Sequence, residues 1–67
     1  MTTQEFNRDF WIVYQDTLIP RSLISLPMLQ SLVGHKIFLL FRKLEQFQGE
    51  KFVWKPFHGT KVIIYRH

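Results

Sequence analysis

Alanine and cysteine are both absent from this chain, so every apolar position carries a large side chain. Apolar and aromatic residues make up 46% of the 67 residues, which is 31 residues, and 16% of the chain is aromatic. A domain of this size buries only about 60% of the surface that its unfolded chain exposes. We therefore expect one folded domain over residues 1–67, with apolar surface left for a partner, and not a disordered chain.

The absence of cysteine removes disulfides and zinc–thiolate sites from consideration. Without disulfides or a signal-peptide pattern at its start, the chain is expected in the cytoplasm. Membrane insertion is not expected, because the longest apolar runs, Phe10–Tyr14 and Ile37–Phe41, have five residues each. A small domain without disulfides or metal commonly depends on association. We predict a homo-oligomer or a subunit of a complex.

The first segment combines a helix start signal with an amphipathic pattern. Glu5 follows Thr2 by three residues, which is the spacing of a capping box. Apolar residues then recur at helical spacing: Phe6, Phe10, Val13, Tyr14 and Leu18. This pattern predicts a helix over residues 3–17 that ends before Pro20, although Phe10–Tyr14 is also rich in residues that favour strands.

A second helix is predicted over residues 25–33. Ser22 or Ser25 can cap its N-terminus, and Pro27 lies in the first turn, where a missing N–H costs nothing. Gly34 follows at the position where a left-handed residue ends many helices.

Residues 36–48 fit two structures. A helix would gather one apolar stripe from Ile37, Leu40, Phe41, Leu44 and Phe47. The uninterrupted apolar run at its start would equally suit a buried strand.

Residues 51–56 and 61–66 are rich in strand-forming side chains and flank His58–Gly59, so they predict a β-hairpin. The fold class is therefore α+β. One arrangement has two or three N-terminal helices followed by the hairpin. The alternative has two helices packed on a three-stranded antiparallel meander of residues 36–43, 51–56 and 61–66.

The order of helices followed by a basic hairpin resembles the winged helix-turn-helix family of DNA-binding domains over residues 26–66. Leu29, Leu32, Val33 and Gly34 resemble the end of the second helix and its turn. Arg42-Lys43-Leu44-Glu45 with Gly49 resembles the end of a recognition helix. The segment Phe52–Tyr65, with His58-Gly59, resembles the wing. The resemblance implies that residues 36–48 are helical and that the chain binds DNA.

Positive charge is concentrated in the second half of the chain. Residues 1–34 hold two basic and three acidic side chains, whereas residues 35–67 hold seven basic and two acidic ones, so the formal net charges are −1 and +5. Such an excess favours an anionic partner. We predict the following nucleic-acid-binding residues: Lys36, Arg42, Lys43, Gln46, Lys55, Lys61 and Arg66.

A second set of residues is predicted to contact protein. Trp11 and Ile12 lie off the stripe of the first predicted helix, and Phe38 and Leu39 lie off the stripe of residues 36–48. Large apolar side chains in such positions are common anchors of protein interfaces.

Catalytic residues, metal ligands and cofactors are not predicted. The serines, histidines and aspartates show no nucleophile-elbow pattern, and His58 and His67 lie at opposite ends of one strand of the hairpin. Two functions remain. The first is a small basic nucleic-acid-binding module, a regulator of transcription or recombination. The second is a small inhibitor or adaptor that docks its exposed apolar surface on an acidic protein.

Overall fold

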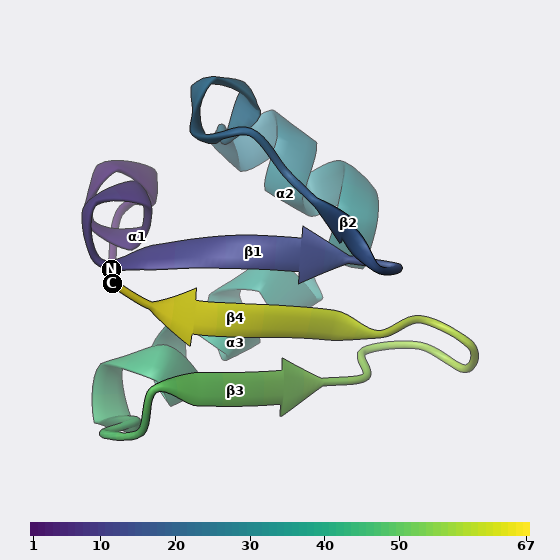
Figure 1. Ribbon diagram of the computed structural model, residues 1–67. Helices are drawn as coiled ribbons and strands as arrows, with labels where there is room; N and C mark the ends of the chain where they lie inside the picture. The colour runs from purple at the N-terminus through teal and green to yellow at the C-terminus, as the bar shows by residue number, and fades with distance from the viewer.

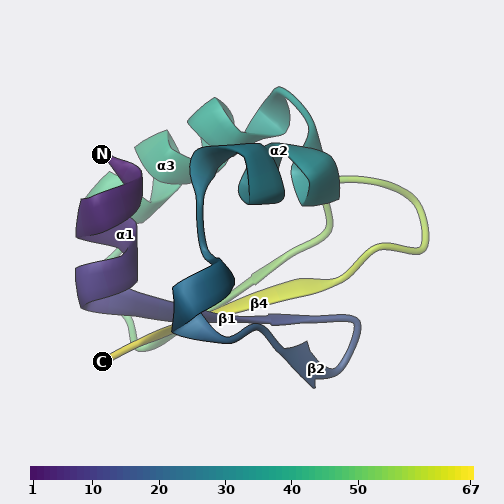
Figure 2. The ribbon, with the colours of Figure 1, turned by 90° about the horizontal axis from the view of Figure 1, so that it is seen from above.

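The computed structural model describes residues 1–67 as a four-stranded antiparallel sheet with three α-helices on one of its faces (Figures 1 and 2). The elements follow in this order: α1 (Thr3–Asp9), β1 (Phe10–Tyr14), β2 (Thr17–Leu18), the 3-10 turn η1 (Arg21–Leu23), α2 (Leu26–Val33), α3 (Lys36–Gln46), β3 (Lys51–Trp54) and β4 (Val62–Arg66). The strand order across the sheet is β2-β1-β4-β3. The chain is therefore α+β, as the sequence predicts.

The predicted helix over residues 3–17 is wrong beyond Asp9. Its start is confirmed: the Thr2 hydroxyl accepts from the Glu5 amide, and the Glu5 carboxylate accepts from the Thr2 amide, both at 3.1 Å. From Phe10 the chain is extended and pairs with β4 along the whole of β1. β3 bonds only one side of β4, so β1 supplies partners for backbone groups on the other side that would otherwise be unpaired. This tertiary pairing overrides the helical spacing of the apolar residues.

β1 turns into β2 through Gln15 and Asp16, which both have positive φ, 49° and 65°. Two-residue hairpin turns of this backbone type match the twist of the strands they join. They usually contain glycine or asparagine, so Gln15–Asp16 gives little sequence signal for a hairpin.

Both later helices match their predicted positions. The Ser25 hydroxyl caps α2 by accepting from the Met28 amide at 3.3 Å. Residues 36–46 form α3, so the alternative meander with a strand over residues 36–43 is wrong. The helix is favoured because it buries its whole apolar stripe, of which Ile37 and Leu40 are fully buried.

The hairpin prediction is confirmed, with Lys51 opposite Tyr65 and Trp54 opposite Val62. Pro56 has no N–H to donate, so the strands separate there into a loop that projects beyond the sheet (Figure 1).

The core lies between the helices and the inner face of the sheet. Phe6 of α1, Leu29 of α2, Leu44 of α3 and Ile64 of β4 are among its members. Ile12, predicted as an interface residue, also belongs to this core and is only 1% exposed. That prediction is wrong because it placed Ile12 on a helix, whereas alternate side chains of β1 face inward. No helix combines the length and the apolar character that crossing a membrane would need.

Candidate binding surfaces

α2 and α3 form a helix–turn–helix pair that is joined by Gly34 and His35. Gly34 ends α2, and its amide donates to the Gln30 carbonyl at 2.7 Å. Its φ of 64° and ψ of −148° lie in a region that only glycine enters readily. The turn therefore differs from the left-handed cap predicted from the sequence, although glycine is needed in both. This conformation sets the direction in which α3 leaves the turn.

The outer face of α3 carries cationic, polar and apolar side chains together. Since Ile37, Leu40, Phe41 and Leu44 point to the core, the 100° rotation per residue directs the opposite side of the helix to solvent. The outer-face residues are Phe38, Leu39, Arg42, Lys43 and Gln46, and all of them are exposed. Phe38 is 57% exposed and Leu39 is 47% exposed. Glu45 also lies on α3, but its carboxylate pairs with the N-terminal ammonium at 3.2 Å.

Lys36 lies at the start of α3 and contacts the β3–β4 loop. Its ammonium donates to the Pro56 carbonyl and lies 4.7 Å from the centre of the Phe57 ring. These contacts hold the hairpin loop beside the N-terminus of α3. Lys36 thus contacts its own chain while it stays exposed, and the nucleic-acid contact predicted for it from the sequence stays a prediction.

Arg66 contacts its own chain as well. Its guanidinium donates to the Phe47 carbonyl at 2.6 Å and to the Gly49 carbonyl at 3.1 Å, and it lies 4.8 Å from the centre of the Phe10 ring. Arg66 is half-buried and closes the end of the core between β4 and the segment that follows α3.

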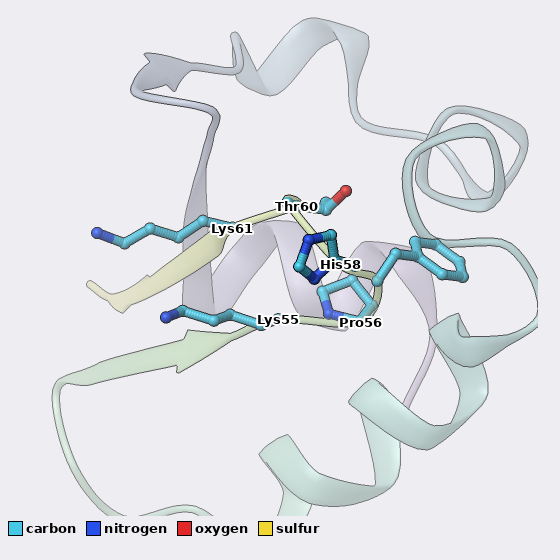
Figure 3. A pocket seen from close by; sticks show the side chains of 7 residues that line it. Lys55, Pro56, His58, Thr60 and Lys61 are labelled. Atoms are coloured by element: carbon cyan, nitrogen blue, oxygen red, sulfur yellow. The ribbon is translucent and has the colours of Figure 1, made fainter.

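Lys55 and Lys61 lie at opposite ends of the hairpin loop and extend side by side in the same direction (Figure 3). The β3–β4 register, continued by one residue, places them opposite each other. Neither forms an ion pair. The loop between them encloses an open hollow of about 690 Å³, to which His58 and Thr60 also contribute.

The seven predicted nucleic-acid-binding residues thus fall into three groups. Arg42, Lys43 and Gln46 share the outer face of α3. Lys55 and Lys61 lie at the sheet, on the side that the helices leave open (Figure 3). Lys36 and Arg66 bind carbonyl groups of their own chain. The first two groups lie on opposite sides of the molecule, because α3 packs on one face of the sheet and the two lysines lie on the side of the other face.

The open face of the sheet is a surface that sequence reasoning missed. No helix covers this side of the strands (Figure 2). Trp11 and Tyr65, which are cross-strand neighbours, stack there with ring centres 4.5 Å apart. The apolar residues on this face are Trp11, Val13, Leu18, Val53, Ile63 and Tyr65. A helix over residues 3–17 would not have brought Trp11 and Tyr65 together, so only the correct β1 assignment could have revealed the surface.

Three ionisable groups of α1 have shifted pKa values. Hydrogen bonds from Thr2 lower the pKa of the Glu5 carboxyl, and the Arg8 guanidinium lowers the pKa of the Asp9 carboxyl. Asp9 in turn raises the pKa of Arg8 through a hydrogen bond of 2.8 Å. These groups are exposed and serve the two ends of the helix. Nowhere do three His, Asp or Glu side chains gather in a way that could hold a metal ion.

Comparisons with known proteins give no match: no family model, no curated protein and no solved structure corresponds to this chain.

Proposed function

We propose that this chain is a non-enzymatic DNA-binding module of the winged helix-turn-helix type that places the outer face of α3 in the major groove. The observation that carries the proposal is the free, cationic outer face of the second helix of a helix–turn–helix pair. Such pairs commonly place their second helix in the groove. An α-helix with its side chains is about 10–12 Å wide, and the major groove is about 12 Å wide.

Four of the five side chains on the outer face of α3 have a matching chemistry in the groove. The Arg42 guanidinium can donate twice to a guanine edge, and the Gln46 amide can pair with an adenine edge. Leu39 lies one turn before Arg42 and Lys43 on the same face and offers an apolar contact for a thymine methyl group. Lys43, at the margin of the face, suits a phosphate oxygen.

The hairpin supports the same orientation. Lys36 joins the β3–β4 loop to the first turn of α3. A duplex that lies along α3 therefore passes close to this loop, where His58 at the exposed tip can meet the sugar–phosphate backbone. In a winged helix-turn-helix protein the hairpin has this place.

The test uses a fluorescein-labelled 20-base-pair duplex of mixed sequence, with binding followed by anisotropy between 50 and 300 mM salt. We expect affinity to fall steeply with salt, because neutralised phosphates release counterions. The double variant Arg42→Gln/Lys43→Gln should bind at least tenfold more weakly. The matched control Lys55→Gln/Lys61→Gln removes the same charge from the other side and should bind the duplex within about threefold of wild type. Equal losses in both variants would show that net charge, and not the face of α3, governs binding.

A protein-binding module remains the second candidate, because Phe38 and Leu39 are large, exposed and adjacent to Arg42. An aromatic-anchored protein interface survives high salt, whereas phosphate binding does not. A chain that binds no duplex at 50 mM salt would favour this second function.

A further inference from the structure

The open face of the sheet has a defined chemical pattern. Strand pairing aligns Lys51, Tyr65 and Trp11 in one row across the sheet. The next row consists of Val53, Ile63, Val13 and Leu18. Lys55 and Lys61 follow beyond the strand ends. The face is therefore an aromatic and aliphatic platform with lysines at its margins.

The lysines of this platform lack anionic partners. No outward position of the four strands holds Asp or Glu, and Lys51, Lys55 and Lys61 take part in no ion pair. Lys55 and Lys61, directly opposite each other, also repel. An anionic ligand would relieve this repulsion, so the charge of the platform is complementary to phosphate.

A cavity of about 330 Å³ opens at one corner of the platform, beside Trp11. Leu18, Ile19 and Pro20 supply apolar walls, and Arg21 and His67 supply polar groups. Arg21 is held in place, because its guanidinium donates to the side-chain and backbone oxygens of Asn7. An aromatic ring beside apolar walls and fixed donors suits a planar, hydrogen-bonding ring such as a nucleobase.

A second copy of this chain fits the platform poorly. Face-to-face packing would bring six lysines together with no carboxylate from either sheet. The strands have five, two, four and five residues, which at about 3.3 Å per residue and about 4.8 Å between strands make a plane of only about 250 Å². A stable interface buries about 800 Å² of accessible surface on each partner, which is more than a plane of this size offers. The platform also presents no helix or loop that could enter the groove of a duplex.

We propose that the open face of the sheet binds single-stranded nucleic acid, independently of α3. A base enters the cavity beside Trp11, and the phosphates run toward Lys61 and Lys55. The four residues from Tyr65 to Lys61 place these lysines about 13 Å along the strand from the aromatic row. The platform would hold an unpaired strand on the side of the molecule opposite the proposed duplex-binding helix.

The experiment compares two probes on wild type and two double variants, with Trp11→Leu as an additional single variant. The probes are fluorescein-labelled dT15 and the 20-base-pair duplex, and the proteins are wild type, Lys55→Gln/Lys61→Gln and Arg42→Gln/Lys43→Gln. We expect the first double variant to lose at least tenfold in affinity for dT15 and about 1.4 in the slope of log affinity against log salt, because each phosphate contact contributes about 0.7. The second should bind dT15 within threefold of wild type. A Trp11→Leu variant that retains the wild-type Tm should bind dT15 about fivefold or more weakly. This factor corresponds to the lower end of the values found when the stacking of one base is removed.

The proposal is overturned if wild type does not bind dT15 at 50 mM salt, or if both double variants lose dT15 affinity equally. It is also overturned if sedimentation equilibrium shows a dimer that Val53→Glu dissociates, because a second copy would then occupy the face. The affinity for the duplex tests the role of α3 separately. Loss of duplex binding only in Arg42→Gln/Lys43→Gln would support the proposed function whatever the result with dT15.

Discussion

Replacement of Gly34 by alanine tests the turn that directs α3. An added Cβ would find room, since its nearest neighbour is the Cζ atom of Phe57 at 3.7 Å. The cost is therefore in the backbone, because φ of 64° with ψ of −148° is strained for any L residue. We expect Gly34→Ala to lower the free energy of unfolding by about 1–3 kcal/mol. Each kcal/mol lowers the Tm of a domain this small by about 4–8 °C.

Two further replacements at Gly34 separate this geometry from an ordinary left-handed cap. Asparagine is tolerated in the left-handed region but not here, so Gly34→Asn should cost about as much as Gly34→Ala. D-alanine, introduced by chemical synthesis, favours the mirror image of an extended conformation, which includes these angles, and should recover most of the loss. Urea unfolding followed by circular dichroism gives the free energies. A Gly34→Asn protein whose free energy of unfolding lies within 0.5 kcal/mol of wild type would show that the turn does not need the conformation that only glycine enters readily.

Three other changes test the packing, the helix cap and the platform. Ile12→Ala should lower the free energy of unfolding by about 2–5 kcal/mol, because Ile12 is in the core. Leu39→Ala, on the exposed face of α3, should change it by no more than about 0.5 kcal/mol. Urea unfolding of both variants distinguishes β1 from the helix that the sequence predicts. The lowered pKa of Glu5 means that its carboxylate stabilises the fold above the ordinary glutamate pKa of about 4.3 and loses this effect as the pH falls through the folded-state pKa. Glu5→Gln keeps the capping geometry without titrating, so its Tm should fall less between pH 5 and pH 3; an identical pH profile would contradict the assignment. Lys61→Glu should raise stability by up to about 1 kcal/mol by removing the repulsion with Lys55, and a lower Tm would show that the two ammonium groups do not interact.

Local signals in the sequence were sufficient for α2 and the hairpin, and for residues 36–48 they favoured a helix but left a strand as the alternative. Ser25 and Gly34 mark the two ends of α2. The apolar residues from Ile37 to Leu44 recur at helical spacing, so only a helix can bury all of their side chains on one side. The hairpin has strand-forming residues on both sides of a loop that contains Pro56 and Gly59. In these elements the local preference and the tertiary packing agree.

β1 could not be assigned from the local sequence, because its apolar residues fit both the spacing of a helix and the alternation of a strand. Phe10, Val13 and Tyr14 continue the helical spacing from Phe6, and Phe10 and Ile12 also alternate as in a strand. The choice depends on β4, about fifty residues later, which requires a partner on its second side. The Gln15–Asp16 turn adds no glycine that would indicate a hairpin.

The candidate binding residues were predictable by charge but not by location. Lys36 and Arg66 are basic residues of the second half of the chain, as Arg42 and Lys61 are, yet their side chains donate to carbonyl oxygens within the chain. Whether a cation faces solvent or closes the core depends on the tertiary contacts around it. The open face of the sheet could be recognised only after β1 was placed beside β4.

The proposed function requires the outer face of α3 to contact duplex DNA. The most direct measurement is a titration of ¹⁵N-labelled chain with an unlabelled 20-base-pair duplex, followed by amide chemical shifts. We expect the largest shifts along α3 and at the Gly34–His35 turn, while the amide signals of Trp11 and Val13 in β1 stay close to their free positions. Shifts confined to the open face of the sheet, or an unchanged spectrum at 50 mM salt, would contradict the proposed function.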